Sequence, residues 1–137
     1  MWMTRVSYQS VYVETDDICR LIVNCSFEIH RRIGPGLLES AYQSILERDL
    51  IRCGLSVESQ KRVSVEYDGL LLKDAFVADL VVERKVVVEI KSVATLLPVH
   101  YKQLLTYLRL LNIRYGLLLN FGGALMKTEV KRVVNGW

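Results

Sequence analysis

The sequence predicts one α/β (α+β) domain with a central mixed sheet flanked by helices. Apolar residues recur at three- and four-residue steps in the first third of the chain and again after residue 97, which is the helical period. Valine-rich runs between these stretches alternate in part with polar residues, as strands do. The 137 residues, 51% of them apolar and 24% charged, suit one domain with its own core. We expect residues 1–15 to form an N-terminal arm and residues 16–137 to form the domain.

Three helices are indicated by spacing and by helix-breaking residues. Residues 16–33 carry a single apolar stripe, and Gly34-Pro35-Gly36 ends the helix they form. A second helix is expected over residues 37–50, with Gly54 closing it. Pro98 suits the first turn of a third helix, which continues to residue 111.

The remaining segments are predicted to be strands. Asp68-Gly69 is a hairpin-turn signal between two of them. The predicted element order is α-α-β-β-β-β-α-β-β. The strand regions are residues 55–67, 75–82, 86–92, 114–120 and 128–134.

Composition excludes several classes of protein. The formal charge of +3 permits a phosphate-backbone partner without requiring one. The three cysteines form no CxxC motif, and His30 and His100 lack zinc-ligand spacing to them, so we expect no zinc site. Residues 1–10 contain no apolar signal-peptide core, and no apolar run approaches the ~18 residues of a membrane span. We therefore expect a cytoplasmic protein.

Two carboxylates and a lysine stand on neighbouring predicted strands. Side chains alternate along a strand, so Glu89 and Lys91 share one face, roughly 7 Å apart. If the loop between the strands has three residues, Asp79 pairs with Glu89, and directly opposed residues have Cβ atoms about 5 Å apart. A two-residue loop would instead put Asp79 opposite Ile90. We predict the three-residue loop, which brings Asp79, Glu89 and Lys91 together.

This grouping has two explanations. One is a solvated sheet face with a cross-strand ion pair. The other is a metal site, because adjacent carboxylates repel each other and a hard cation such as Mg²⁺ or Mn²⁺ compensates them. The surrounding valines favour the metal site, since a solvent-facing strand would carry more polar residues. Such a metal polarises a phosphate and acidifies a bound water, while Lys91 would orient that water or stabilise the developing charge.

Two further segments carry polar residues that suit the same site. His100, Gln103 and Tyr107 form a polar stripe on the third predicted helix. A glutamine and a tyrosine one turn apart can hold a ligand carboxylate or bind a phosphate, although a half-exposed helix edge would look the same. Glu39 would bring a third carboxylate to the metal; the alternative is an acid that favours the start of a helix.

Several of these motifs, taken in order, resemble those of a known family. The segment Gly36-Leu37-Leu38-Glu39-Ser40-Ala41-Tyr42 fits the motif that names the GxxExxY protein family, whose members resemble compact PD-(D/E)xK nuclease-like domains. FVADLVVERKVVVEIKSV resembles the family's acidic core, and PVHYKQLLTYLRLLNIRYGLLLNFG resembles its QxxxY helix and following strand. The resemblance covers residues 16–136 and implies a restriction-endonuclease-like core. The proline of the class motif is replaced by Ala78.

The resemblance implies a role for each matching residue. Asp79 and Glu89 would be metal ligands for Mg²⁺ or Mn²⁺ and Lys91 the catalytic lysine, with Glu39 as the first-helix acid and Gln103 and Tyr107 as the QxxxY pair. It predicts a divalent-metal-dependent nuclease that hydrolyses phosphodiester bonds, with DNA ahead of RNA as the substrate.

A homodimer is one expected assembly, because two cuts need two sites. The alternative function is a non-catalytic binding or assembly module that uses the fold as a scaffold. The basic residues available for backbone contacts are scattered: Arg31, Arg32, Lys61, Arg62, Lys102, Lys127, Lys131 and Arg132.

Overall fold

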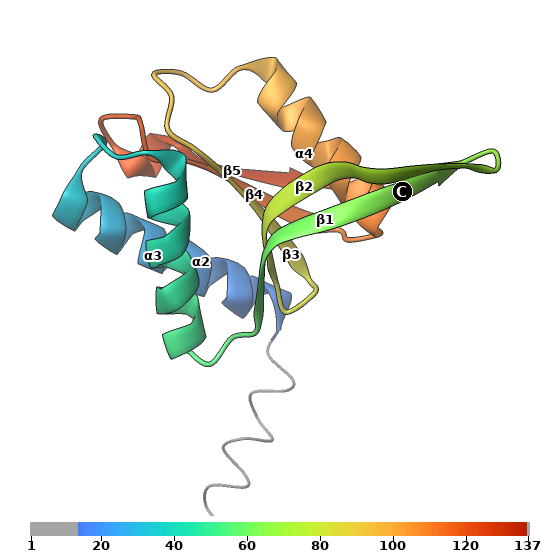
Figure 1. The fold of residues 1–137 in the computed structure, drawn as a ribbon. Helices are drawn as coiled ribbons and strands as arrows, with labels where there is room; N and C mark the ends of the chain where they lie inside the picture. The colour runs from blue at the N-terminus through green and yellow to red at the C-terminus, as the bar shows by residue number, and fades with distance from the viewer. Residues whose placement is uncertain (1–13, 137) are drawn as a thin grey trace, which may run out of the picture.

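The computed structural model of the protein describes residues 14–136. Within them three long helices and five strands form an α+β domain (Figure 1). The elements in chain order are α2 (Thr15–Ile33), α3 (Glu39–Arg52), β1 (Val57–Tyr67), β2 (Leu70–Val82), β3 (Val86–Lys91), α4 (Pro98–Leu111), β4 (Tyr115–Asn120), the 3₁₀ helix η1 (Met126–Thr128) and β5 (Val130–Val134).

The strands form one mixed sheet in the order β1-β2-β3-β4-β5. The β3–β4 pair is parallel and is connected through α4, whereas the other three pairs are antiparallel. A parallel pair needs such a crossover connection, and α4 supplies it. The predicted mixed sheet flanked by helices is confirmed.

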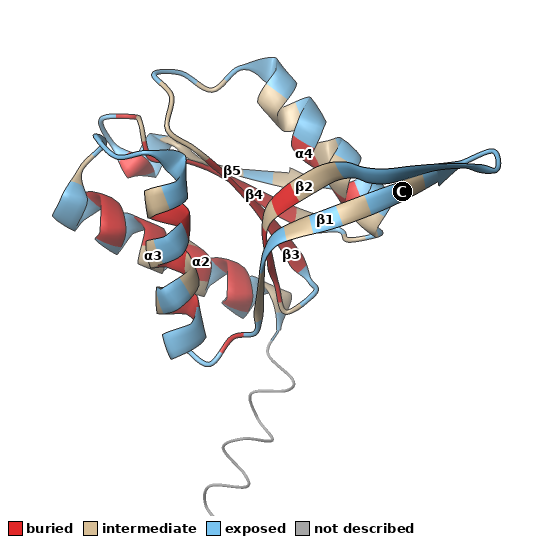
Figure 2. Cartoon of the chain, in the orientation of Figure 1, coloured by how far each residue is buried: buried red, intermediate tan, exposed pale blue. Residues whose placement is uncertain are grey.

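Strand β3 lies at the centre of the core. Its even-numbered residues Val86, Val88 and Ile90 pack with α2 and α3, and Val87 packs on the opposite face with Leu104 of α4. Figure 2 shows the buried residues concentrated in these central strands and in the inward sides of the helices. Burial on both faces explains why the β3 sequence is an almost continuous apolar run.

The far halves of β1 and β2 leave the body of the domain as a two-stranded ribbon (Figure 1). We call residues 62–75 the hairpin arm. Its tip turns at Asp68 and Gly69, with φ of 49° and 83°, as expected for a two-residue hairpin loop. The predicted turn is confirmed. The arm is exposed almost throughout, in contrast to the buried end of β2 (Figure 2).

Some predicted boundaries were wrong. The expected order counted four strands before the last long helix, although only three strand regions were predicted there; the structure has three, the first of which, residues 57–67, has a bulge between Val63 and Val65. Strand β2 begins at residue 70 rather than 75, since pairing with β1 extends it beyond the core. The last strand begins at residue 130 rather than 128, because the chain first makes a 3₁₀ turn.

The predicted N-terminal arm, residues 1–15, lies outside the described residues except for its last two, of which Thr15 already begins α2. Across residues 14–136, no helix is both long enough and apolar enough to cross a membrane.

Candidate active site

The site lies where the sheet divides. Strands β2 and β3 pair at only three positions, Val82 with Val86, Val81 with Val87 and Leu80 with Val88. This register confirms the predicted three-residue loop. Immediately beyond the last pair, β2 turns away with β1 into the hairpin arm, while β3 continues beside β4. Asp79 and Glu89 occupy the next position, at the fork between the two branches.

At the fork, side chains replace the main-chain ladder. The backbone N–H of Ile90 donates to Asp79 Oδ2 at 2.8 Å, and the backbone N–H of Asp79 donates to Glu89 Oε1 at 3.1 Å. Each carboxylate is therefore held by the opposite strand, and the two are brought side by side. An antiparallel pair normally closes this position with a backbone carbonyl, so the exchange fixes both acids at the point of divergence.

Burial and mutual repulsion change the protonation of Glu89. Glu89 is only 8% exposed. Its pKa is raised to about 8, first by burial and then by the charge of Asp79, whereas the charge of Lys91 opposes this rise. Two acids that cannot both ionise cheaply need a nearby cation. A pair of adjacent carboxylates is a donor set that fits a hard divalent cation such as Mg²⁺ or Mn²⁺.

Residues of α4 close one side of the fork. The ring of Tyr107 stacks on Phe76 of β2, with centroids 4.2 Å apart. The pKa of Tyr107 is raised by its own burial and then by the charges of Glu89 and Asp79, so its hydroxyl lies within their field. Gln103 lies one helical turn earlier and is exposed. The structure thus brings Tyr107 to the acids and leaves Gln103 at the solvent edge of the same helix.

His100 has a different role from the one that the predicted polar stripe gave it. Its Nδ1 accepts a hydrogen bond from the backbone N–H of Leu97, at 3.0 Å. The imidazole therefore caps the start of α4, which is a structural use of the side chain.

The structure places Glu39 at the first residue of α3, with its side chain exposed. This end of the helix is tied to the chain just after Lys91, because the Ser92 hydroxyl donates to the Leu37 carbonyl at 2.9 Å. Among the described residues, however, no group of three or more histidine, cysteine, aspartate or glutamate side chains is close enough to hold a metal. Glu39 therefore does not join Asp79 and Glu89 in such a group.

Tyr42, the last residue of the GLLESAY segment, has a structural role. Its hydroxyl donates to the Gly34 carbonyl and accepts from the Leu37 backbone N–H, and its ring stacks on Phe121 with centroids 4.4 Å apart. The side chain is fully buried. Tyr42 thus fixes the turn that precedes α3 and, through it, the position of Glu39.

Two glutamines at the site were missed in the sequence. The side-chain amide of Gln60 donates both to Asp79 Oδ1, at 3.2 Å, and to Gln43 Oε1, at 2.7 Å. Gln43 in turn donates to the hydroxyl of Ser59 at 3.1 Å. This chain of hydrogen bonds links α3 to Asp79 across β1. The signal for Gln43 was present, since it stands four residues after Glu39 on the same helix face. Gln60 sits at a left-handed position, with φ of 49°, that the sequence does not reveal.

Asn120 secures the chain beyond Lys91. Asn120 on β4 pairs with Lys91 on β3. The buried side chain of Asn120 accepts hydrogen bonds from the backbone N–H groups of Val93 and Gly122, both at 3.0 Å. It also donates to the Val93 carbonyl at 2.9 Å. Gly122 allows this close approach, because a Cβ there would clash with the Val93 backbone. The sequence signal for this role of Asn120 was its place as a polar residue that ends a buried strand and precedes Phe-Gly-Gly.

Comparison with known proteins assigns the family. No curated protein matches the chain. A family model described as the PD-(D/E)XK nuclease superfamily matches residues 16–133, a range that includes both branches of the fork and all three residues Asp79, Glu89 and Lys91. The fold agrees with a restriction-endonuclease-like core, with helices on both faces of a mixed sheet. The chain belongs to the PD-(D/E)XK nuclease superfamily.

Proposed function

We propose that this protein is a divalent-metal-dependent nuclease that hydrolyses phosphodiester bonds, with DNA ahead of RNA as its substrate. The observation that carries the proposal is the paired carboxylate site, where Asp79 and Glu89 are each held by the opposite strand at the fork. Membership of a nuclease superfamily supports the reaction class. The fold alone would not, because one fold hosts many functions.

Asp79 and Glu89 are the residues that would hold Mg²⁺ or Mn²⁺. When bound, such a cation polarises the phosphate and makes its coordinated water more acidic. Glu89 has to lose its proton to serve as a ligand, and its raised pKa means that binding releases that proton near neutral pH. Asp79 is kept in place by Gln60 and by the Ile90 backbone.

Lys91 lies on the same face of β3 as Glu89, two residues further on, and lowers the pKa of Glu89. In the proposed reaction its ammonium orients the attacking water or stabilises the negative charge that develops on the phosphate. Tyr107 and Gln103 line the α4 side and would contact the phosphate or orient a ligand. Glu39 would approach the metal as a third acid from the start of α3.

The finer assignment to the GxxExxY family is part of this proposal. Its support is the segment from Gly36 to Tyr42, which forms the turn before α3 and the first residues of that helix. Glu39 and Tyr42 have distinct positions there, one exposed at the helix start and one buried in the core.

The experiment is cleavage of labelled single-stranded, double-stranded and branched DNA, and of RNA, with Mg²⁺ and with Mn²⁺. Lys91→Ala and Asp79→Ala are compared with the wild type, and Lys73→Ala, an exposed lysine of the hairpin arm, is the matched control. We expect metal-dependent cleavage by the wild type and by Lys73→Ala, and its loss in the two site variants.

A metal titration of the same proteins separates the alternatives. Binding of Mn²⁺ that disappears in Asp79→Ala and persists in Lys91→Ala supports the assigned roles. A folded wild type that neither binds metal nor cuts any of the substrates contradicts the nuclease proposal and leaves the non-catalytic scaffold function.

A further inference from the structure

The tip of the hairpin arm is the most apolar exposed surface in a single segment of the described chain. Tyr67 is 74% exposed, and Leu70, Leu71 and Leu72 are 59%, 64% and 46% exposed. These four residues surround the turn at the end of a ribbon that projects away from the domain (Figure 1). Contiguous apolar side chains held out in solvent mark an interaction surface.

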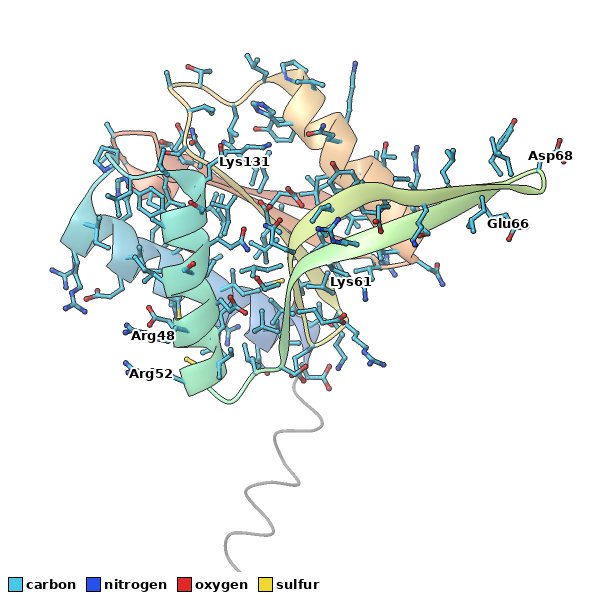
Figure 3. All side chains as sticks on the ribbon, viewed as in Figure 1. Arg48, Arg52, Lys61, Glu66, Asp68 and Lys131 are labelled. Atoms are coloured by element: carbon cyan, nitrogen blue, oxygen red, sulfur yellow. The ribbon has the colours of Figure 1, made fainter. Side chains whose placement is uncertain are left out.

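The same tip is acidic. Figure 3 shows Glu66 and Asp68 at the far end of the arm. Within the described part of the chain, neither of these carboxylates has an ion-pair or hydrogen-bond partner. Lys73 is the one basic residue in the segment 64–74, which also carries Asp74, so the tip is negative in a chain whose net charge is +3. A negative tip is repelled by nucleic-acid phosphates, and its partner is therefore a protein surface that is apolar and basic.

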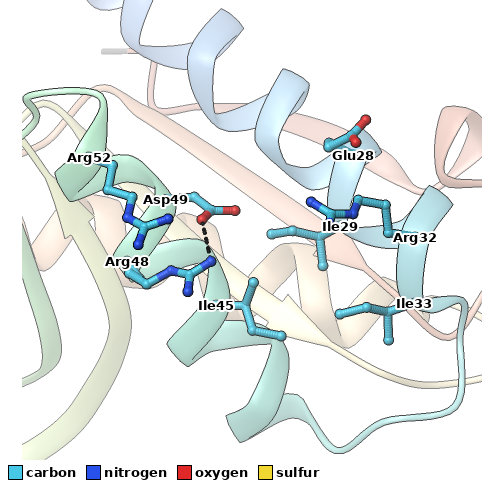
Figure 4. Close-up of a pocket in the computed structure, with 8 residues that line it drawn as sticks. All are labelled: Glu28, Ile29, Arg32, Ile33, Ile45, Arg48, Asp49 and Arg52. Carbon is cyan, nitrogen blue, oxygen red and sulfur yellow. Dashed lines mark hydrogen bonds and ion pairs between the residues drawn. The ribbon is translucent and has the colours of Figure 1, made fainter.

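A surface that combines isoleucine side chains with more arginines than acids exists on the chain itself. Between α2 and α3 lies a cavity of about 410 Å³, which we call the α2–α3 pocket. Its lining combines three isoleucines with three arginines and two acids (Figure 4). The lining residues are Glu28, Ile29, Arg32, Ile33, Ile45, Arg48, Asp49 and Arg52.

The arginines of the pocket are only partly neutralised. Arg48 pairs with Asp49 at 3.3 Å, and Glu28 is engaged by Arg31, outside the pocket. Among residues 14–136 Arg52 has no side-chain partner, whereas Arg32 interacts electrostatically with Glu28, whose pKa is lowered first by Arg31 and further by Arg32. The isoleucine side chains and the unpaired guanidinium group of Arg52 are complementary to leucine and tyrosine beside unpaired carboxylates, in both polarity and charge.

The arm cannot reach the pocket of its own chain. Figure 3 places Arg48 and Arg52 at one end of the molecule and Glu66 and Asp68 at the other, with the sheet between them. We propose that the hairpin arm of one molecule docks into the α2–α3 pocket of a second copy, with Leu70 and Leu71 against the isoleucines. Because the two surfaces differ, the contact is head-to-tail, and repetition of it builds rings or chains of subunits.

The test measures molecular mass in solution over a range of protein concentrations, by sedimentation equilibrium. The wild type is expected to exceed the mass of one chain as its concentration rises. The arm variant Leu70→Ser/Leu71→Ser and the pocket variant Arg48→Glu/Arg52→Glu are each expected to stay monomeric. Leu125→Ser, which removes an equally exposed leucine elsewhere, and Arg20→Glu, at the other end of α2, are matched controls that should associate like the wild type.

Mixing the two variants gives the decisive result. The arm variant retains an intact pocket, and the pocket variant retains an intact arm, so an equimolar mixture forms one contact and stops at twice the mass of one chain. Association through two arms would leave the pocket variant unaffected and the mixture without restored contacts, which would overturn the proposal. So would a wild type that stays monomeric at every concentration.

A second arm variant guards against misfolding of the first. Glu66→Lys/Asp68→Lys keeps the apolar tip and reverses its charge. We expect it to lose association with the wild-type pocket and to bind the pocket variant Arg48→Glu/Arg52→Glu. Failure to bind the reversed pocket would contradict the charge complementarity. None of these positions belongs to the fork, so nuclease activity and association are tested separately.

Discussion

The two halves of β2 have similar apolar content and opposite surroundings. Residues 70–72 are three consecutive leucines and are exposed, whereas Leu80, Val81 and Val82 are almost completely buried. The buried half has β3 beside it and helices on both faces of the sheet, but the exposed half has only β1 as a neighbour. Burial was decided by the neighbouring layers of the fold, since the residue types are nearly the same.

The change of surroundings occurs at Asp79. There β2 loses its partner β3, and the freed backbone N–H groups are taken up by the two carboxylates. A continuous β2–β3 ladder would leave no room for this exchange. The candidate active site is thus built at the boundary between the two halves.

The largest effect on stability is expected from removing a buried leucine in the inner half. Leu80 is fully buried in the core formed with α2 and α3. Leu80→Ala leaves a cavity and should lower the free energy of unfolding by about 2–5 kcal/mol. Urea denaturation followed by circular dichroism measures it. A loss as small as that of an exposed leucine would show that this end of β2 is not part of the core.

A pH-dependent effect is expected at the boundary. The pKa of Glu89 is raised from 4.5 to about 8 by burial and by Asp79. Between these values the folded protein keeps a proton that the unfolded chain releases. In metal-free buffer the free energy of unfolding should therefore fall as the pH rises through this window, by at most roughly 1.4 kcal/mol per pH unit.

The matched variant for this prediction is Glu89→Gln, which removes the titrating group and keeps the shape of the side chain. We expect its stability to lose this fall with pH, and saturating Mg²⁺ to reduce the fall in the wild type, because the cation favours the ionised acid. Identical slopes for the two proteins in urea denaturation with chelator would contradict the raised pKa.

A smaller effect is expected from the glutamine that supports Asp79. Gln60→Ala removes the donor to Asp79 Oδ1 and breaks the link to Gln43. If Asp79 is a metal ligand as proposed, loss of the residue that orients it should weaken Mn²⁺ binding by about tenfold, as measured by isothermal titration calorimetry. Since Gln60 is exposed, its removal should barely change the unfolding curve. Unchanged affinity would mean that Asp79 is positioned by the Ile90 backbone alone.

The smallest effect is expected in the outer half of β2. Leu71 is 64% exposed, and Leu71→Ser should change the free energy of unfolding by no more than about 0.5 kcal/mol. The comparison with Leu80→Ala uses two leucines of one strand, so composition is held constant. A large destabilisation measured at low protein concentration would show that the arm is packed within its own chain.

The sequence was sufficient for the local features of this protein. Apolar periodicity predicted the three long helices, and Asp68-Gly69 predicted the hairpin turn. The valine run with Glu89 and Lys91, and the loop of three residues after Val82, predicted which residues face one another across the hairpin. These features depend on neighbours a few residues apart, and side-chain period and turn geometry fix such relations.

Only the tertiary structure decided where the sheet divides, which leucines are buried, and which side chains reach Asp79. Gln60 contacts Asp79 through a left-handed backbone at residue 60, and Gln43 arrives from a separate helix. Glu39 has the expected position in its motif, yet it is not grouped with the other acids. Such relations depend on how elements that are distant in the sequence pack together. The pattern of residues along the chain does not tell which element will cover a given face of a helix or strand.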